Sequence, residues 1–374
     1  MDISVIVEFL KAFLFGIVEG ITEWLPISST GHMMLLNQFV NLDVSPAFYD
    51  VFLVVIQLGA IMAVLILYFH KLNPFSHKKS AEQKKLTWGI WGKVVVGSIP
   101  AAIIGLAFDN WMEEHVTNNP DIAYIVVACA LIFYGILFII IELNNRRRLR
   151  QLKEGAALGA SGADGGVLDA SGVAKNQAKS GAKAFHGKHS PEAVEAMTGG
   201  ITAAFEAASA EQKAERPFDP YVDIADDPDD ASNAVSKVTN FGELGFGRAF
   251  IIGIFQALAI VPGTSRSGSI IIGSMLLGCS RTVATEFAFF LAIPIMFGWS
   301  LLKFFKHGFA YSGLEWAIFG IGIVTAFVVS ILSIKFLMSY IKKNDFTAFG
   351  VYRIALGALV LLFFGGQAAG WFLL

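Results

Sequence analysis

Two stretches of this chain place polar and charged residues inside hydrophobic segments, and the two stretches are similar to each other. Residues 16–32 read GIVEGITEWLPISSTGH and residues 253–269 read GIFQALAIVPGTSRSGS. Aligning their first glycines places Glu19 on Gln256, and a one-residue slip brings their prolines together. Hydrophobic segments that Gly and Pro break at corresponding positions of two halves are typical of a membrane repeat with its polar site between the copies. The chemistry of this chain is therefore expected where the two loops meet.

The composition is that of a polytopic membrane protein. The chain is 55% hydrophobic and contains 33 Phe residues, far from the usual composition of soluble proteins. The formal net charge of -2 excludes a broad basic face for nucleic acid. Cys129 and Cys279 each lie in an apolar run and are expected to be packed side chains, not a disulfide or a metal pair.

Six segments are apolar enough to cross a membrane, although the one at residues 94–108 is short and contains Pro100. The other five are Val51–Phe69, Ile122–Ile141, Ala284–Leu302, Trp316–Met338 and Phe349–Leu374. Ile3–Leu25 and Phe250–Val261 instead run into a proline and a Ser/Thr/Gly loop before a second short apolar piece. They are expected to form re-entrant hairpins, because irregular backbone at membrane depth needs protein or water around it. The predicted fold is an all-α polytopic membrane protein with six spanning helices and two re-entrant helical hairpins.

The loop charges predict an orientation. Basic residues gather at 70–85 and 146–150, and acidic residues gather at 109–121, so the positive-inside rule places the basic loops in the cytoplasm. Three spans in each half make the repeat inverted, so the first hairpin enters from the outer face and the second from the inner face. Lys303 and Lys306 fall outside and run against this assignment.

The chain is predicted to have three parts. Residues 1–145 form the first membrane repeat and residues 242–374 form the second, each with one re-entrant hairpin and three spans. Residues 146–241 are rich in Gly, Ala, Ser, Lys and Asp and contain no apolar run long enough to span. This segment is predicted to be a cytoplasmic linker that is partly disordered.

Two carboxylates of the first stretch require a positive partner. Glu19 and Glu23 are four residues apart, so on a helix they share one face. At membrane depth each would cost about 2.5–3.5 kcal/mol on insertion scales. Arg266 is one candidate partner, and a divalent cation such as Mg²⁺ or Ca²⁺, which prefers carboxylate oxygen, is the other. The alternative is a structural Glu–Arg pair that holds the hairpins together.

The loops themselves are suited to an anion. Small hydroxylated residues with Gly leave backbone N–H groups exposed at the start of the following helix, which suits phosphate, although capping of the helix is the alternative function. Arg266 adds a planar, permanently charged fork that suits phosphoryl oxygens. His32, close in sequence to Ser29 and Glu23, is a candidate general acid, general base or nucleophile, or else a packed, hydrogen-bonded residue. The loop residues are Ser28, Ser29 and Thr30 in the first stretch and Thr264, Ser265, Arg266 and Ser267 in the second.

The motifs EGITEWLPISSTGH and PGTSRSG resemble the two signature motifs of the bacitracin-resistance undecaprenyl-diphosphate phosphatase family. The resemblance extends to VIQLGAI at Val55–Ile61 and VYRIALG at Val351–Gly357. It implies that the chain removes the terminal phosphate of undecaprenyl diphosphate, which recycles the lipid carrier for peptidoglycan synthesis. It also implies a place in the bacterial cytoplasmic (inner) membrane, a site reached from the periplasmic or outer face, and dependence on a divalent cation.

The resemblance assigns roles by motif position. It implies catalytic roles for Glu23, Ser29, His32 and Arg266, metal binding by Glu19 and Glu23, and substrate binding by Ser28, Thr30, Thr264, Ser265, Ser267 and, as a weaker match, Arg353. We expect Ser29 to be the nucleophile, activated by Glu23 directly or through His32, with attack by an activated water as the alternative. A polyprenyl-phosphate transporter or flippase is the rival function. The sequence leaves open whether the chain forms a homodimer, and the linker is longer than the resemblance leads us to expect.

Overall fold

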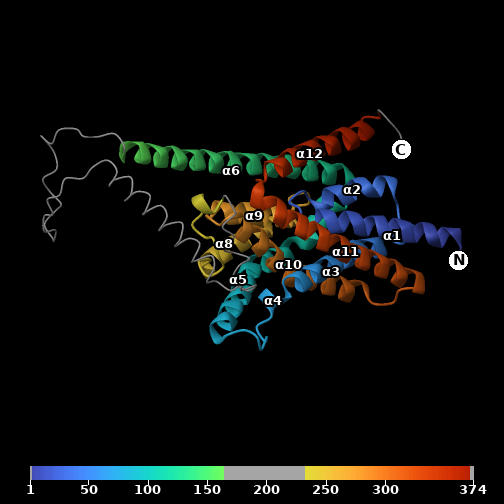
Figure 1. Cartoon of the computed structure of the whole chain (residues 1–374). Coiled ribbons are helices and arrows are strands. Elements are labelled where there is room, and N and C mark those ends of the chain that lie inside the picture. The colour runs from blue at the N-terminus through green and yellow to red at the C-terminus, as the bar shows by residue number, and fades with distance from the viewer. Residues whose placement is uncertain (1, 164–231, 371–374) are drawn as a thin grey trace, which may run out of the picture. The chain divides into compact units, whose positions relative to one another are not determined.

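The structure, a computed structural model, describes residues 2–163 and 232–370, and the helices of these residues are joined by short loops (Figure 1). Within these ranges, residues 2–150 and 232–370 form one compact unit. Its long helices are α1 (Ile3–Thr22), α3 (Pro46–Leu67), α5 (Ala81–Met112), α6 (Pro120–Ala163), α10 (Arg281–His307), α11 (Gly313–Lys343) and α12 (Thr347–Ala368). The shorter ones are α2 (Ser29–Phe39), α4 (Phe69–Leu72), η1 (Glu113–Thr117), η2 (Asn233–Val235), α8 (Phe246–Ala257), η3 (Leu258–Ile260) and α9 (Arg266–Leu276).

Six of these helices are long and apolar enough to cross a membrane, and each overlaps one of the six predicted spans: α3, α5, α6, α10, α11 and α12. Serine caps explain where several of them begin. Ser45, Ser80, Ser280 and Ser312 precede α3, α5, α10 and α11, and each side chain accepts a hydrogen bond from a backbone N–H three residues on. The cap at Ser80 starts α5 well before the short apolar run at residues 94–108, so that run is part of a much longer helix.

Each predicted hairpin is a pair of helices joined by a polar loop. The first is α1, the loop at residues 23–28 and α2; the second is α8, η3, the loop at residues 261–265 and α9. Neither α1 nor α8 is among the six spanning helices. That these hairpins enter the membrane and turn back within it stays a prediction.

Glycines let the first helix of each hairpin approach a spanning helix closely. A Cβ atom on Gly16 would lie 2.7 Å from the Thr325 Cβ atom of α11, and one on Gly253 would lie 2.1 Å from the Gly97 carbonyl oxygen of α5. Small residues that bring backbones together are the usual means of helix packing in membranes. The aligned glycines of the two stretches therefore have the same function in the fold, which supports the repeat.

The two loops have the same backbone at the start of the second helix. Ser28 and Ser265 have positive φ angles of 74° and 68°, the only non-glycine residues to do so in the described ranges. Each serine caps its helix by accepting a hydrogen bond from the backbone N–H of a glycine, Gly31 at 3.4 Å and Gly268 at 3.1 Å. The repeat thus continues through both loops.

This equivalence corrects the sequence alignment. Ser28 and Ser265 are separated by the same number of residues as Gly16 and Gly253, so the alignment needs no slip. The residue that matches Pro26 is Gly263, not Pro262. The one-residue slip of the sequence alignment was therefore wrong, because it matched residue types and not the positions of the caps.

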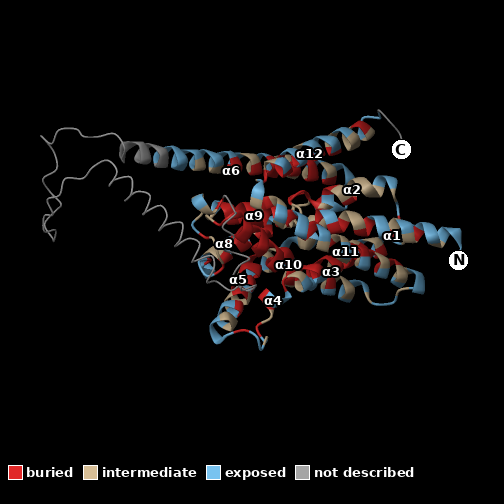
Figure 2. Cartoon of the chain, in the orientation of Figure 1, coloured by how far each residue is buried: buried red, intermediate tan, exposed pale blue. Residues whose placement is uncertain are grey.

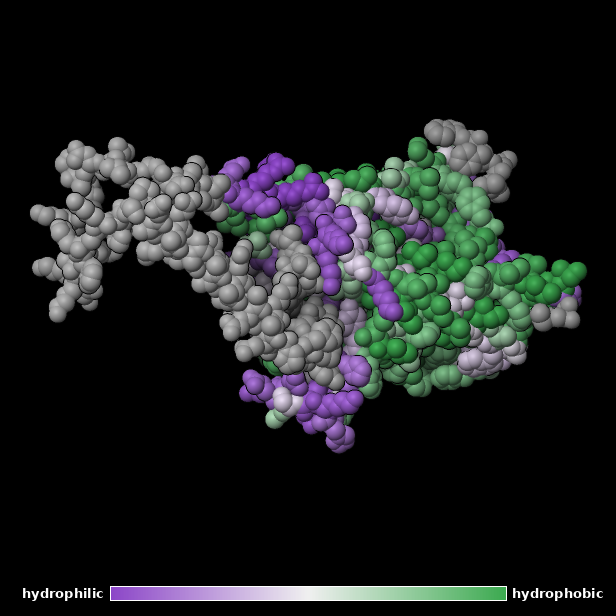
Figure 3. Space-filling view, viewed as in Figure 1, coloured by the Kyte–Doolittle hydropathy of each residue, from purple (hydrophilic) through white to green (hydrophobic). Residues whose placement is uncertain are grey.

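The centre of the compact unit is the first half of α10. Every residue from Arg281 to Ile293 is buried, and Figure 2 shows this segment and α9 surrounded by the other helices. Large hydrophobic side chains are also exposed on the outer helices, such as Ile103 at 63%, Val324 at 61% and Leu362 at 66%. Figure 3 shows that hydrophobic side chains cover a broad area of one face, with hydrophilic side chains gathered beside it. Such a surface is expected where lipid surrounds the protein.

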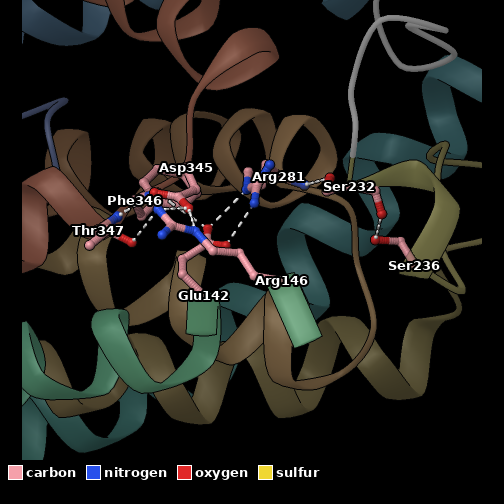
Figure 4. A network of polar contacts seen from close by, with 8 residues as sticks. All are labelled: Glu142, Arg146, Ser232, Ser236, Arg281, Asp345, Phe346 and Thr347. Atoms are coloured by element: carbon pink, nitrogen blue, oxygen red, sulfur yellow. Dashed lines mark hydrogen bonds and ion pairs between the residues drawn. The ribbon is translucent and has the colours of Figure 1, made fainter. Parts of the chain in front are cut away.

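A buried polar cluster ties α6 to α10 and α12 (Figure 4). The Glu142 carboxylate accepts two hydrogen bonds from Arg281, at 2.9 and 2.7 Å, and one from the Phe346 backbone N–H at 3.2 Å. Arg146 forms an ion pair with Asp345. Arg146 was predicted to begin the linker, but α6 continues through it to Ala163.

The other end of the predicted linker also belongs to the compact unit. Val238 and Phe241 are buried in the hydrophobic core, and the Val238 backbone N–H donates to the Gly278 carbonyl oxygen at 3.0 Å. The predicted linker between these ends, residues 164–231, lies outside the described residues.

The two lysines that ran against the predicted orientation have acidic partners. Lys303 lies 3.6 Å from the carboxylate of Glu113, and Lys306 lies 3.8 Å from that of Asp109. Both partners belong to the acidic segment predicted to be outside. The two lysines at this end of α10 therefore each have an acidic neighbour, and the orientation stays a prediction.

Candidate active site

A cavity of about 250 Å³ lies where the two loops meet. Its lining includes Glu23, Ser29, Thr30, Ser265 and Arg266 from the loops and the starts of α2 and α9. The remaining lining comes from α3, α5, α8, η3 and α10. The structure thus brings together residues that lie more than half the chain apart in sequence.

Glu23 is the centre of the polar contacts in this cavity. It is 7% exposed, and each of its carboxylate oxygens accepts one hydrogen bond. The Ser29 hydroxyl donates to Oε2 at 2.9 Å, and Arg266 Nη2 donates to Oε1 at 2.8 Å. A carboxylate within hydrogen-bond reach of a serine hydroxyl is the arrangement by which a general base activates a nucleophile.

Ser29 and Arg266 occupy matching positions of the repeat. Each is the first residue of its helix, directly after the positive-φ serine. Both α2 and α9 therefore begin at the cavity and have their N-termini there. Backbone N–H groups and the helix dipole at such an end favour an anion.

Arg266 is held by more than the carboxylate. Its Nη1 donates to the Ala288 carbonyl oxygen at 3.3 Å, and its guanidinium lies 5.9 Å from the ring of the fully buried Trp24. These contacts fix the cation at the wall of the cavity. The same carbonyl belongs to the buried first half of α10, so the site rests on the most enclosed element of the fold.

The remaining loop serines and threonines differ in position. Ser267 donates to the Glu23 carbonyl oxygen at 3.1 Å and lies 3.2 Å from the Ser265 hydroxyl, so it joins the two loops. Ser28 and Thr264 are buried, and Ser28 serves as a helix cap. Thr30 is exposed and lines the cavity.

His32 does not meet Glu23 or Ser29 in this structure. Its Nδ1 lies 2.7 Å from the Ser28 carbonyl oxygen, and its Nε2 lies 2.7 Å from the Tyr352 hydroxyl. Since a carbonyl only accepts, Nδ1 carries the proton and Nε2 accepts from Tyr352. His32 does not line the cavity, so its arrangement is that of a hydrogen-bonded packing residue.

Arg353 lies behind the loops and does not line the cavity. It is fully buried and donates to three loop carbonyl oxygens, those of Pro26 at 3.2 Å, Gly263 at 3.0 Å and Thr264 at 2.8 Å. Pro26 and Gly263 are the matching positions of the two loops. These contacts make Arg353 a clamp that positions both loops, whereas the sequence suggested contact with substrate.

Sequence reasoning gave no role to two glutamines that line the cavity, Gln57 and Gln256. Gln256 is 2% exposed, and neither atom of its amide group has a hydrogen-bond partner among the described residues. Both glutamines could have been found. Gln256 is the residue that the repeat aligns with Glu19, and Gln57 lies in the VIQLGAI motif.

Glu19 has an oxygen suited to a cation. It is 2% exposed, its Oε1 has no hydrogen-bond partner among the described residues, and it does not line the cavity. The described ranges contain no group of three or more His, Cys, Asp or Glu side chains that could hold a metal. Mg²⁺ and Ca²⁺ accept carboxylate and amide oxygens, and often use substrate phosphate as well. The unpartnered oxygens of Glu19 and Gln256 are donors of this type, and a cation bound by Glu19 and Glu23 stays a prediction.

The fold and the cavity define the class of this protein. The chain is an all-α, multi-pass membrane protein with an internal repeat, and its repeated loops build a cavity that suits a phosphorylated ligand. Residues 12–162 and 192–359 match the family model described as bacitracin resistance protein BacA. The chain belongs to this family.

Curated relatives match along nearly their whole length. An undecaprenyl-diphosphatase of Enterococcus faecalis is 42% identical over 354 residues, which cover 94% of this chain and 95% of the relative. Proteins of the same name from Acetivibrio thermocellus and Desulfitobacterium hafniense are 41% and 43% identical, and the matches cover 96% and 97% of this chain and 98% of each relative. The two segments that match the family model leave residues 163–191, within the predicted linker, unmatched.

Proposed function

We propose that the chain is an undecaprenyl-diphosphatase, which hydrolyses undecaprenyl diphosphate to undecaprenyl phosphate and inorganic phosphate. In the cell this reaction would recycle the lipid carrier for peptidoglycan synthesis and confer bacitracin resistance. The observation that carries the proposal is Glu23, buried between the Ser29 hydroxyl and the Arg266 guanidinium in a cavity at two helix N-termini. The family and the names of the relatives support the same substrate. No contact among the described residues favours the rival transport function, and the relatives are named for hydrolysis.

The hydrogen bond from Ser29 to Glu23 supports serine as the nucleophile. The Ser29 oxygen attacks the terminal phosphorus, its proton passes to Glu23 Oε2, and the bond from that phosphorus to the bridging oxygen breaks. Undecaprenyl phosphate leaves with the electron pair of the broken bond. Glu23 passes its proton to the leaving oxygen of undecaprenyl phosphate and is a carboxylate again. It then takes a proton from a water that attacks the phosphoserine, the bond from phosphorus to the Ser29 oxygen breaks, and Glu23 returns the proton to that oxygen as phosphate leaves.

Charge on the transferred phosphoryl group is stabilised by groups already in place. Arg266 has N–H donors beyond those bound to Glu23 and Ala288, and the helix N-termini supply backbone donors. Phosphoryl transfer depends mainly on such positioning and electrostatic stabilisation. When bound, a divalent cation held by Glu19 and Glu23 would neutralise part of the charge of the diphosphate.

The proposal includes the location of the site. Six apolar helices support a multi-pass membrane protein. We place it in the cytoplasmic (inner) membrane with its cavity open to the outer face. Asp109 supports this side, because it lines the cavity and belongs to the acidic segment predicted to be outside. A homodimer stays a prediction, which cross-linking in native membranes would test.

Phosphate release by the purified protein tests the proposed function. With undecaprenyl diphosphate we expect stoichiometric phosphate and undecaprenyl phosphate, and we expect release to stop with chelator and resume with added Mg²⁺ or Ca²⁺. A rapid acid quench should trap phosphate on Ser29, detectable by mass spectrometry. No phosphate release by folded protein with cation present would reject the enzyme. Release without any trapped phosphoserine would favour direct attack by water.

A further inference from the structure

A second hollow, of about 240 Å³, lies between α5 and α10. It is lined by three residues of α5 and five residues of α10, and none of them is charged. Leu106, Pro294 and Leu302 are among them. We call this hollow the α5–α10 groove.

The α5–α10 groove is continuous with the catalytic cavity. Ala101, Ile295 and Trp299 line both. On α5, residues 101, 105 and 109 are four apart and face the cavity, whereas residues 102 and 106 lie on the neighbouring stripe and face the groove. Two adjacent stripes of α5 therefore line two different hollows, the polar cavity and the apolar groove.

The groove lies beside the lipid-facing surface and has free space. Leu106 in its wall is 64% exposed, and Ile103 and Phe297 beside it are 63% and 57% exposed. A Cβ atom on Gly298 would meet no atom within 4 Å. A Cβ atom on Gly105, by contrast, would lie 2.9 Å from the Trp299 ring, so that indole packs directly on α5 at the junction of groove and cavity.

We infer that the α5–α10 groove is where the isoprenyl tail of the substrate leaves the catalytic cavity for the bilayer. This inference rests on the proposed function and adds the binding site of the tail. A lipid diphosphate whose head occupies the cavity needs an apolar way out for its tail, and the groove is apolar, joined to the cavity and next to lipid. The occupant is a branched hydrocarbon chain attached to a diphosphate.

The groove gives the tail a route out of the cavity and adds little to the binding free energy of the substrate. Lipid tails are as apolar as the groove wall, so moving the tail from bilayer to groove gains little free energy. Filling the groove should therefore lower kcat/KM more for a substrate with a long tail than for one with a short tail. A substrate with one isoprene unit should be affected much less than one with eleven.

Gly298→Leu tests this inference, with Gly320→Leu as its matched control. Both glycines are exposed helical positions where a Cβ meets no atom within 4 Å, but Gly320 is on α11 and lines neither the groove nor the cavity. The measured quantity is kcat/KM for undecaprenyl diphosphate divided by kcat/KM for dimethylallyl diphosphate. Gly298→Leu should lower this ratio about tenfold or more, and Gly320→Leu should leave it within about twofold of the wild type.

Failure of the groove inference and failure of the proposed function give different results in this experiment. An active wild type whose ratio is unchanged in Gly298→Leu overturns the groove and leaves the proposed function intact. A wild type that releases no phosphate from either substrate rejects the proposed function instead.

Photolabelling tests the groove without catalysis. A polyprenyl diphosphate that carries a diazirine in its first isoprene units should label peptides containing residues 101–106 and 294–302, and Gly298→Leu should remove most of that label. Label spread evenly over the lipid-facing helices overturns the inference. Equal labelling of these peptides by a phospholipid with the same diazirine would also overturn it, because the groove would then hold ordinary bilayer lipid.

Discussion

The loop before α2 and the loop before α9 have one backbone but different chemistry. Both contain a positive-φ serine that caps the following helix through a glycine N–H. The next residue is Ser29 in the first loop and Arg266 in the second, and both side chains bind the same carboxylate, Glu23. The repeat supplies two equivalent scaffolds, and their side chains supply the proposed nucleophile and base on one side and the cation on the other.

The difference shows how a symmetric fold supports an asymmetric reaction. A phosphoryl transfer needs a nucleophile at the phosphorus and positive charge around its oxygens, and two identical loops would supply only one of these. The first helices of the two hairpins differ in the same way, because Glu19 on α1 carries a charge and the matching Gln256 on α8 does not.

The largest effect is expected from Arg266→Ala. It removes the cation of the second loop, so the turnover rate should fall by about 10³-fold or more, as when an arginine that stabilises a transferred phosphoryl group is lost. Phosphate release from purified protein gives the rate, and size-exclusion chromatography checks the fold. Arg248→Ala, on α8 of the same hairpin but bound to the Glu243 carbonyl oxygen, is the control and should keep full activity. A folded Arg266→Ala protein with normal turnover would remove Arg266 from the mechanism.

Ser29→Ala changes the other side of the comparison. Without the attacking oxygen, turnover should fall by about 10²-fold or more, because only binding and charge stabilisation remain. Thr30→Ala is the control, because Thr30 lines the same cavity but follows the nucleophile; it should raise KM at most several-fold. Single-turnover measurements with acid quench distinguish the steps. If Ser29→Ala retained most of its turnover, water would be the nucleophile.

Much of the fold was predictable because the thickness of the bilayer sets how long an apolar spanning segment has to be. All six spans follow from apolar runs, and the repeat follows from paired glycines, which turned out to pack α1 on α11 and α8 on α5. Helix starts were less predictable. The cap at Ser80 extends α5 into a polar segment, and α6 continues past Ile141, since polar residues continue a helix once it has begun.

The candidate site was predictable by residue type but not by contact. Glu23, Ser29 and Arg266 do meet, as the need to neutralise a buried carboxylate suggests. His32 and Arg353 instead bind backbone carbonyls near the loops, and a sequence gives no direction for a side chain. The sequence did not indicate a role for Gln256, because a neutral amide costs less to bury than a carboxylate and so does not predict a charged partner.

Arg353→Ala should weaken both sides of the comparison equally, because Arg353 clamps both loops. It leaves the buried carbonyls of Pro26, Gly263 and Thr264 without this donor, at a cost on the order of 3 kcal/mol. We expect a clearly lower Tm in detergent and a smaller loss for Arg353→Lys, which keeps the charge but not the fork. An unchanged Tm with normal folding but a raised KM would instead assign Arg353 to the substrate.

Glu19→Gln makes the first helix like the second at the matched position. If Glu19 holds the cation, the Mg²⁺ or Ca²⁺ concentration for half-maximal activity should rise by about tenfold, while the rate at saturating cation changes less. A cation titration of phosphate release measures this. Gln256→Glu is the matched control, and it should lower the required concentration. The same titration curve for all three proteins would show that neither side chain binds the cation.

The smallest effects are expected at the two caps, and they test whether the backbones are truly equivalent. Ser28→Ala and Ser265→Ala should each lose about 1 kcal/mol of stability, since alanine cannot cap. Glycine at either position should cost only a few tenths of a kcal/mol, because it adopts the φ angles of 74° and 68° without strain. Thermal unfolding in detergent should therefore rank wild type, Gly and Ala in the same order at both positions. A different order at the two serines would mean that the loops share φ angles but not energetics, and the repeat would then explain the shape of the site without explaining its stability.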